Sequence, residues 1–177
     1  SYSAWATDYG TFIVKFETSP SQSRTDGREG NFFTYSGASQ SYTGKYADIN
    51  LTDNSKGGLK LNSSGWLRFT TLAPSNIIIV QSDDKNAASG IKINGTGNTS
   101  GVANATDGVV VFTLNNQPAG SYEILRNGSE VGIIYVKVEY TEAPKQTYNA
   151  SFANGGHGTA PSAQEDVASV TLPTITT

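Results

Sequence analysis

Short apolar segments alternate with turn residues along most of the chain. The clearest candidate strands are rich in β-branched or aromatic residues and are bounded by Gly, Asn, Pro or Asp, a pattern typical of strands between turns. No window of helical length keeps an apolar i, i+3, i+4, i+7 stripe. The pattern therefore predicts an all-β fold, an antiparallel, jelly-roll-like β-sandwich. The predicted strands are Thr11–Glu17, Asn31–Tyr35, Leu59–Asn62, Trp66–Leu72, Asn76–Gln81, Val109–Leu114, Ser121–Arg126 and Gly132–Tyr140.

Period-two alternation assigns the faces of these strands, because successive side chains in a strand point to opposite sides. Lys60 is expected to face outward between two inward leucines, and Trp66 shares a face with Arg68. Arg126 lies near the end of a strand with mixed faces. The last strand divides into a predicted core-facing set, Ile134, Val136, Val138 and Tyr140, and an opposite set, Ile133, Tyr135, Lys137 and Glu139.

Length and composition narrow the possible classes of protein. The 177 residues suffice for one sandwich-sized domain and a short appendage, with no Cys to form disulfides or ligate zinc. The absence of Met favours a piece excised from a longer precursor. The longest apolar run, Ile77–Val80, is too short to span a bilayer, so we expect no membrane partner. A net charge of −3 disfavours nucleic acid as a partner, and any polyanion would have to meet a local basic patch.

Candidate catalytic and metal-binding residues are sparse. His157, the only histidine, lies in a Gly-rich turn without an orienting partner, so a Ser-His-Asp triad and an enzymatic role are disfavoured. Asp48, Asp53, Asp107 and the pair Asp83–Asp84 could contribute oxygen ligands to a structural calcium, although none has the spacing of an EF-hand loop. No cofactor is expected, and structural calcium stays open.

The character of the sequence changes after Tyr140. Residues 143–147 are typical of a linker, which leaves 1–142 as the β-sandwich and 148–177 as a separate segment. The stretch from Tyr148 through Asn154-Gly-Gly156 to Val170-Thr-Leu-Pro173 resembles the start of a Listeria–Bacteroides-type surface repeat. The resemblance covers residues 147–173 and implies an extracellular or cell-surface location in a bacterium.

Several segments, in order, resemble the family 77 carbohydrate-binding modules attached to bacterial pectate lyases. The resemblance covers about residues 31–140 and is carried by Tyr42-Thr-Gly-Lys-Tyr46, Gly58-Leu-Lys-Leu-Asn62, Leu67-Arg-Phe-Thr-Thr71, Ile91-Lys-Ile-Asn-Gly95, Val109–Leu114, Ala119-Gly-Ser-Tyr-Glu-Ile-Leu-Arg126 and Ile133-Ile-Tyr-Val136. It implies a β-sandwich that binds homogalacturonan through lysines. Lys45 and Lys60 fall at two of those lysine positions, and Arg126 replaces a third lysine while keeping its charge.

The sequence therefore predicts non-catalytic binding of a plant cell-wall polysaccharide, with pectic galacturonan favoured. Lys45, Lys60 and Arg126 would pair with uronate carboxylates, and Trp66, Tyr135 and Lys137 would extend the surface. Linked catalytic or surface modules in the parent protein are the expected covalent partners. Two alternatives stay open: a structural or adhesive spacer of a bacterial surface protein, and a neutral β-glucan-binding module that uses Trp66 and tyrosines.

Overall fold

The computed structural model describes residues 7–17, 32–39, 41–52, 57–146, 148–150 and 164–167. The chain folds as two compact units, Ser1–Ala143 and Pro144–Thr177. Within the described part of the second unit, β15 (Tyr148–Ala150) pairs antiparallel with β16 (Gln164–Val167). His157 and the Val170–Pro173 segment lie outside the described residues, so the surface-repeat assignment stays a prediction.

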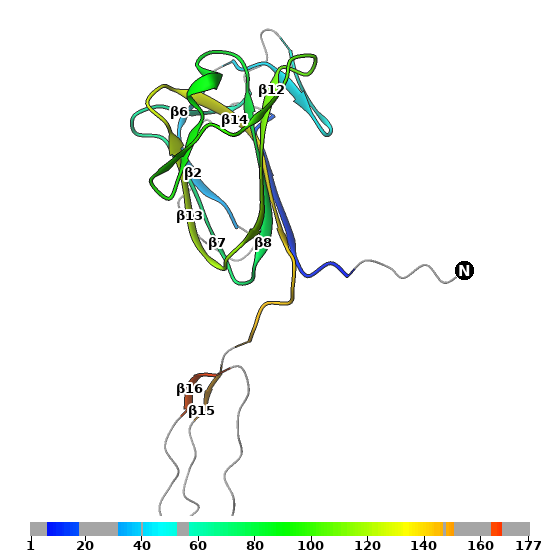
Figure 1. Ribbon diagram of the computed structural model, residues 1–177, viewed down its shortest axis with the longest axis vertical. Helices are drawn as coiled ribbons and strands as arrows, with labels where there is room; N and C mark the ends of the chain where they lie inside the picture. The colour runs from blue at the N-terminus through cyan, green and yellow to red at the C-terminus, as the bar shows by residue number, and fades with distance from the viewer. Residues whose placement is uncertain are drawn as a thin grey trace, which may run out of the picture. The chain divides into compact units, whose positions relative to one another are not determined.

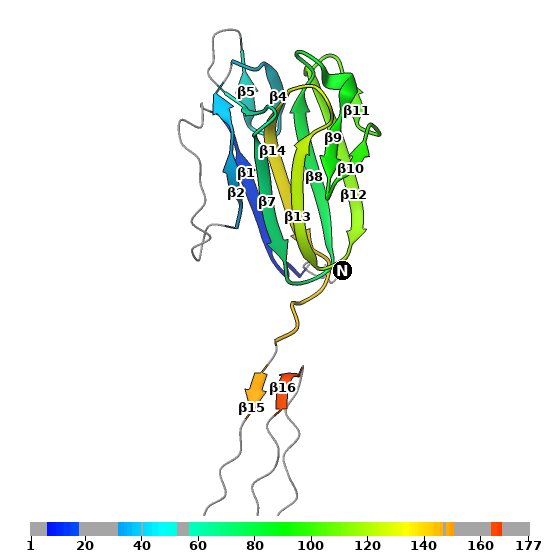
Figure 2. The same ribbon diagram turned by 90° about the vertical axis from the view of Figure 1, so that its left-hand side faces the viewer.

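Two antiparallel sheets form the first unit, which confirms the predicted β-sandwich (Figures 1 and 2). The seven-stranded sheet, here called sheet A, has the order β11-β12-β8-β14-β6-β3, with β1 paired to β14. Its strands are β1 (Thr11–Lys15), β3 (Ala38–Ser39), β6 (Leu59–Leu61), β8 (Ser75–Ser82), β11 (Val102–Asn104), β12 (Val109–Gln117) and β14 (Val131–Tyr140).

The five-stranded sheet, sheet B, has the order β10-β9-β13-β7-β2. It consists of β2 (Thr34–Ser36), β7 (Trp66–Thr71), β9 (Ile91–Ile93), β10 (Thr96–Asn98) and β13 (Gly120–Arg126). One 3₁₀ helix, η1 (Ala87–Ser89), lies between β8 and β9. No helix in the described ranges is long and apolar enough to cross a membrane.

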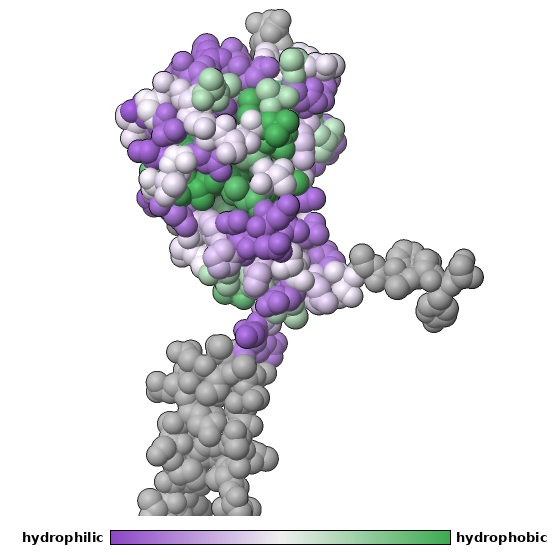
Figure 3. All heavy atoms as spheres, in the orientation of Figure 1, coloured by the Kyte–Doolittle hydropathy of each residue, from purple (hydrophilic) through white to green (hydrophobic). Residues whose placement is uncertain are grey.

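The main core lies between the facing sides of the two sheets. Alternation explains its composition: in β7, Leu67 and Phe69 are buried, whereas the intervening Arg68 and Thr70 are exposed. Burial of one such side chain contributes about 1.5–3 kcal/mol to stability. Figure 3 shows hydrophobic side chains gathered between the sheets at one edge, with hydrophilic side chains around them.

A second, smaller core covers part of the outer side of sheet A. The hairpin of β4 (Gly44–Tyr46) and β5 (Ile49–Leu51) packs there, and its Ile49 and Leu51 cluster with Val80, Val109 and Ile134. This hairpin was not among the predicted strands. It gives sheet A an apolar cover where an exposed face was expected.

The predicted faces of β14 are wrong at two positions, Ile133 and Ile134, and a β-bulge is the reason. Between Ile133 and Tyr135 the register with β8 shifts, so Ile134 and Tyr135 point to the same outer side. Ile133 therefore belongs to the main core and Ile134 to the second core, the reverse of simple alternation. From Val136 onward the predicted faces hold, with Val136 and Val138 in the main core.

Candidate functional site

Lys60 pairs with one carboxylate where β14 begins, and the charges of two further basic residues act on the same group. The Nζ of Lys60, on β6, lies 2.8 Å from Oε2 of Glu130. The Lys60 hydrogen bond is the main cause that lowers the pKa of Glu130, and the positive charges of Lys60, Lys85 and Arg126 lower it further. Three cations from β6, the turn after β8, and the end of β13 therefore act on one carboxylate. We call Lys60, Lys85, Arg126 and Glu130 the cation cluster.

Strand pairing explains why Lys60 takes this position. Lys60 is opposite Gly132 in the register of β6 with β14, and paired residues point to the same side of a sheet. Leu59 and Leu61 are fully buried on the other side. The predicted outward orientation of Lys60 is thus confirmed, and its side chain is 23% exposed because Glu130 and neighbouring strands cover part of it.

Tyr42 packs beside the cation cluster. A Cβ on Gly132 would come within 2.5 Å of the Tyr42 ring, so the absence of a side chain there makes room for the aromatic ring. The Tyr42 side chain is fully buried, and its hydroxyl has no hydrogen-bond partner among the described residues. Burial, together with the charges of Glu130 and Asp84, raises the pKa of Tyr42 to about 12. The ring therefore stays neutral and fixes the surface next to Lys60.

Ser82 connects Tyr42's segment to the turn that carries Lys85. Its Oγ donates a hydrogen bond to the carbonyl oxygen of Thr43 at 2.6 Å and accepts one from the backbone N–H of Asp84 at 3.1 Å. Lys85 follows in this turn with a positive φ of 57° and is exposed. The turn thus places a lysine at the cluster that strand patterns could not identify.

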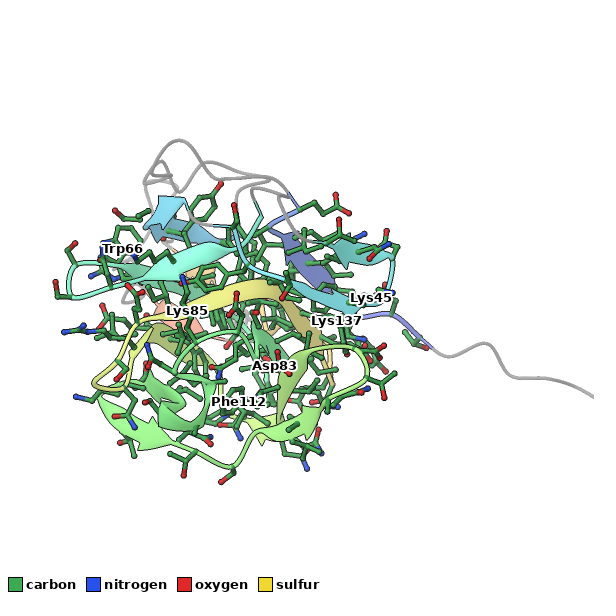
Figure 4. All side chains as sticks on the ribbon, turned by 90° about the horizontal axis from the view of Figure 1, so that it is seen from above. Lys45, Trp66, Asp83, Lys85, Phe112 and Lys137 are labelled. Atoms are coloured by element: carbon green, nitrogen blue, oxygen red, sulfur yellow. The ribbon has the colours of Figure 1, made fainter. Side chains whose placement is uncertain are left out.

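Lys45 occupies a different place, on the β4–β5 hairpin. It is exposed, and its backbone N–H donates to the carbonyl oxygen of Asp107 at 2.7 Å. Together with Thr43, Thr52 and the turn before β12, it lines a shallow recess of about 320 Å³. In the view of Figure 4, Lys45 lies on the opposite side of the sandwich end from Lys85 and Trp66. Lys60 pairs with Glu130 and the charge of Arg126 acts on the same carboxylate, whereas Lys45 is carried by a separate element.

Tyr135 and Lys137, both predicted to extend the binding surface, differ in exposure. Tyr135 points to the outer side of sheet A, but the hairpin covers it: its side chain is only 6% exposed and its ring centroid lies 4.9 Å from that of Tyr46. Its ring is thus largely covered, and its part in a sugar-binding surface stays a prediction. Lys137 lies on the same side, 3.7 Å from Glu139, and keeps an accessible ammonium group with 30% of the side chain exposed.

Trp66 lies on the other sheet. It begins β7 opposite Ser36 of β2, on the outer side of sheet B, and the guanidinium carbon of Arg68 lies 4.0 Å from the centre of its ring. Arg68 in turn pairs with Glu123 at 2.7 Å. Trp66 therefore belongs to an outer surface separate from that of Lys60.

The acidic residues considered for calcium are dispersed. Asp48 pairs with Lys15 at 2.6 Å, and Asp107 bonds to Asn104 at 3.0 Å. Asp53 lies outside the described residues. In the described ranges, no three His, Cys, Asp or Glu side chains are grouped so that they could hold a metal ion.

Comparison with known proteins identifies a family and supports the fold. Residues 10–136 match the family model described as carbohydrate binding module 77. A solved structure from Ruminococcus flavefaciens, reported under "The complexity of the Ruminococcus flavefaciens cellulosome reflects an expansion in glycan recognition", aligns with a TM-score of 0.52 and 19% identity. The alignment covers 76% of this chain and 97% of that chain, and supports the fold. No curated protein matches the sequence.

Proposed function

Because the chain belongs to the carbohydrate-binding module 77 family, we propose that the glycan it binds is pectic homogalacturonan. Modules of this kind are non-catalytic, so the chain binds a polysaccharide without cleaving it. In this proposal the parent protein is extracellular or at the cell surface, and the module keeps a linked enzyme near insoluble substrate. Its contribution is effective concentration rather than chemistry.

The observation that carries this proposal is the pairing of Lys60 with the Glu130 carboxylate. Lys60 contacts Glu130 directly, and Lys85 and Arg126 act on the same group. A galacturonate residue presents the same functional group on a polymer. The guanidinium of Arg126 could also bind a carboxylate through two parallel hydrogen bonds, which a lysine cannot do. In binding, a uronate would take the place of Glu130 against Lys60.

Lys45 and Lys137 are proposed as outlying contacts along a polymer. Both are accessible lysines on the sheet A side of the sandwich, one on the hairpin and one on β14. Each exposed contact contributes little alone and is weakened by salt. Several such contacts along a repeating polyanion would together produce useful affinity, and retention should fall as NaCl is raised.

The test is affinity electrophoresis of wild type and Lys60→Ala through gels containing polygalacturonate. We expect Lys60→Ala to bind about tenfold or more weakly, since hydrogen bonds between charged groups contribute roughly 1.5–3 kcal/mol. Its thermal midpoint should change little, because an accessible ion pair adds little stability. Lys92→Ala is the matched control: it removes a lysine from β9, on sheet B.

Two outcomes would reject the proposal. One is unchanged galacturonan retention of Lys60→Ala at low salt. The other is wild-type protein that is not retarded by polygalacturonate at all. Equal losses in Lys60→Ala and Lys92→Ala would show that overall charge, and not the cation cluster, governs binding.

A further inference from the structure

The outer side of sheet B carries a depression that the galacturonan site does not use. It has a volume of about 710 Å³ and extends over β2, β7, β13 and the turn after β9. Figure 2, which looks onto this sheet, shows those strands side by side. Three aromatic residues, Phe32, Phe69 and Tyr122, contribute to its lining together with six polar ones: Thr34, Arg68, Thr70, Asn94, Ser121 and Glu123.

Strand register explains how residues distant in sequence gather there. Arg68 of β7 is opposite Glu123 of β13, and Thr70 is opposite Ser121. Thr34 of β2 is opposite Arg68 on the other flank of β7. Because directly paired residues point to the same side, all five side chains project into one surface. The core-facing Phe69 and Tyr122 alternate with them and stack at 5.2 Å between ring centroids, which supports the strands from below.

Hydrogen bonds hold these polar groups in place. Nε of Arg68 donates to Oε2 of Glu123 at 2.7 Å. Both groups of the Asn94 side-chain amide are hydrogen-bonded to β13. Its NH₂ donates to the carbonyl oxygen of Ser121 at 3.1 Å, and its oxygen accepts from the backbone N–H of Glu123 at 2.8 Å. The hydroxyls of Thr70 and Ser121 lie 3.3 Å apart. The surface is therefore organised before any ligand arrives, which lowers the cost of binding.

The chemistry of the depression suits an uncharged sugar. The guanidinium of Arg68 retains further N–H donors, and the Glu123 carboxylate retains acceptor positions. The pair can therefore donate a hydrogen bond to one sugar hydroxyl and accept a hydrogen bond from another. The two charges neutralise each other, whereas Lys85 and Arg126 leave the surroundings of the Lys60–Glu130 pair net positive, so the depression is the surface better suited to an uncharged ligand. Next to the depression, Trp66 offers an apolar ring held by the Arg68 guanidinium 4.0 Å from its centre. Apolar rings of this kind suit the face of a pyranose.

We infer that sheet B forms a second glycan-binding site, which takes an uncharged polysaccharide through Arg68, Glu123 and the adjacent Trp66. This site lies on the opposite sheet from Lys60 and differs from the galacturonan site in ligand charge. One module would thus contact two different polymers, a charged one at the cation cluster and a neutral one on sheet B.

The experiment measures retention of Glu123→Ala and Trp66→Ala in gels containing xyloglucan or arabinoxylan, with polygalacturonate gels run in parallel. We expect wild type to be retarded by at least one neutral polymer, independently of salt, and both variants to lose most of that retardation, about tenfold in affinity. Polygalacturonate retention should be unchanged in both. Lys60→Ala should show the reverse pattern, so failure of one site is distinguishable from failure of the other.

A structural readout guards against variants that fold poorly. In ¹H–¹⁵N NMR titrations of wild-type protein, the neutral polymer's oligosaccharides should shift the amide signals of Ser121 and Glu123 and leave those of Lys60 and Glu130 unmoved. Absence of wild-type retention by both neutral polymers would overturn the inference. So would full neutral-polymer binding by folded Glu123→Ala and Trp66→Ala, or shifts confined to sheet A.

Discussion

At the scale of single residues, Glu130 is the side chain that sequence reasoning overlooked and the structure makes central. Its carboxylate lies 2.8 Å from the ammonium group of Lys60. It therefore competes with a uronate of the ligand for pairing with Lys60. Replacement by an uncharged isostere frees Lys60 and removes a negative charge that repels the ligand. We predict that Glu130→Gln binds polygalacturonate roughly three- to tenfold more tightly, as measured by isothermal titration calorimetry at low salt.

A matched variant separates this local effect from overall charge. Glu142→Gln makes the same change in net charge, but Glu142 is exposed and follows the far end of β14, away from Lys60. It should leave the affinity close to that of wild type. Weaker binding by Glu130→Gln would contradict the competitor role, and would mean that Glu130 holds Lys60 in the geometry that binding needs.

Tyr42 has a buried hydroxyl without a partner among the described residues, which gives it a testable signature. Replacing such a group by an apolar one of the same shape is nearly neutral or stabilising. We predict that Tyr42→Phe is as stable as wild type or up to about 1 kcal/mol more stable in urea denaturation at pH 8. Tyr42→Ala, which also removes the ring against Gly58 and Gly132, should cost about 3–5 kcal/mol.

The raised pKa of Tyr42 adds a dependence on pH to the same comparison. The folded protein holds the phenolic proton up to a pKa of about 12, against 10.0 ordinarily. Its contribution to stability is therefore full below pH 10 and is lost as the pH rises towards 12. Wild type should lose more stability than Tyr42→Phe between pH 9 and pH 11.5. Equal losses would show that the Tyr42 hydroxyl is not buried in solution.

Residue-level sequence reasoning succeeded where alternation alone decides the outcome. Lys60 lies between two leucines in a regular strand, so its outward direction followed directly from the pattern. Lys85 and Glu130 are in turns, where no periodicity constrains side-chain direction. Their proximity comes from strand order: β6 and β8 both flank β14, and β13 leads into it. Such long-range pairing leaves no trace in the local sequence.

At the scale of elements, the short hairpin and the bulge account for what the sequence could not predict. All eight predicted strands are present, with ends that differ by a few residues. The β4–β5 hairpin buries Tyr135. Alternation along β14 had predicted an exposed position for this residue. The bulge at Ile134 reverses a face because one extra residue shifts a period of two. Both features depend on contacts with other strands and not on the β14 sequence itself.

The close fit between β14 and Tyr42 gives a prediction at this scale. A Cβ at Gly132 would lie 2.5 Å from ring atoms of Tyr42, and the ring itself is fully buried. Gly132→Ala should therefore destabilise the protein by about 1–3 kcal/mol in urea denaturation, the usual cost of overfilling a packed site. In a Tyr42→Ala background the same substitution should cost much less, because the obstructing ring is gone. Additive costs would show that backbone strain, and not the ring, opposes the alanine.

At the scale of the whole molecule, the question is how much of the chain the binding module needs. The family match spans residues 10–136, and the first compact unit ends at Ala143. The end of this unit is tied to the sandwich by specific contacts. The hydroxyl of Tyr140 accepts a hydrogen bond from the N–H of Leu72 at 3.0 Å, and Thr141 N–H donates to the carbonyl oxygen of Pro74 at 2.8 Å.

These contacts predict a sharp boundary for truncation. A chain ending at Ala143 keeps both contacts, so its thermal midpoint and polygalacturonate affinity should equal those of the full chain, by calorimetry. A chain ending at Glu139 loses Tyr140, which is 6% exposed in the main core, and should be less stable by about 3–5 kcal/mol, as for removal of a large core aromatic. If the chain ending at Ala143 bound more weakly while remaining folded, residues beyond 143 would have to contribute to the glycan site directly.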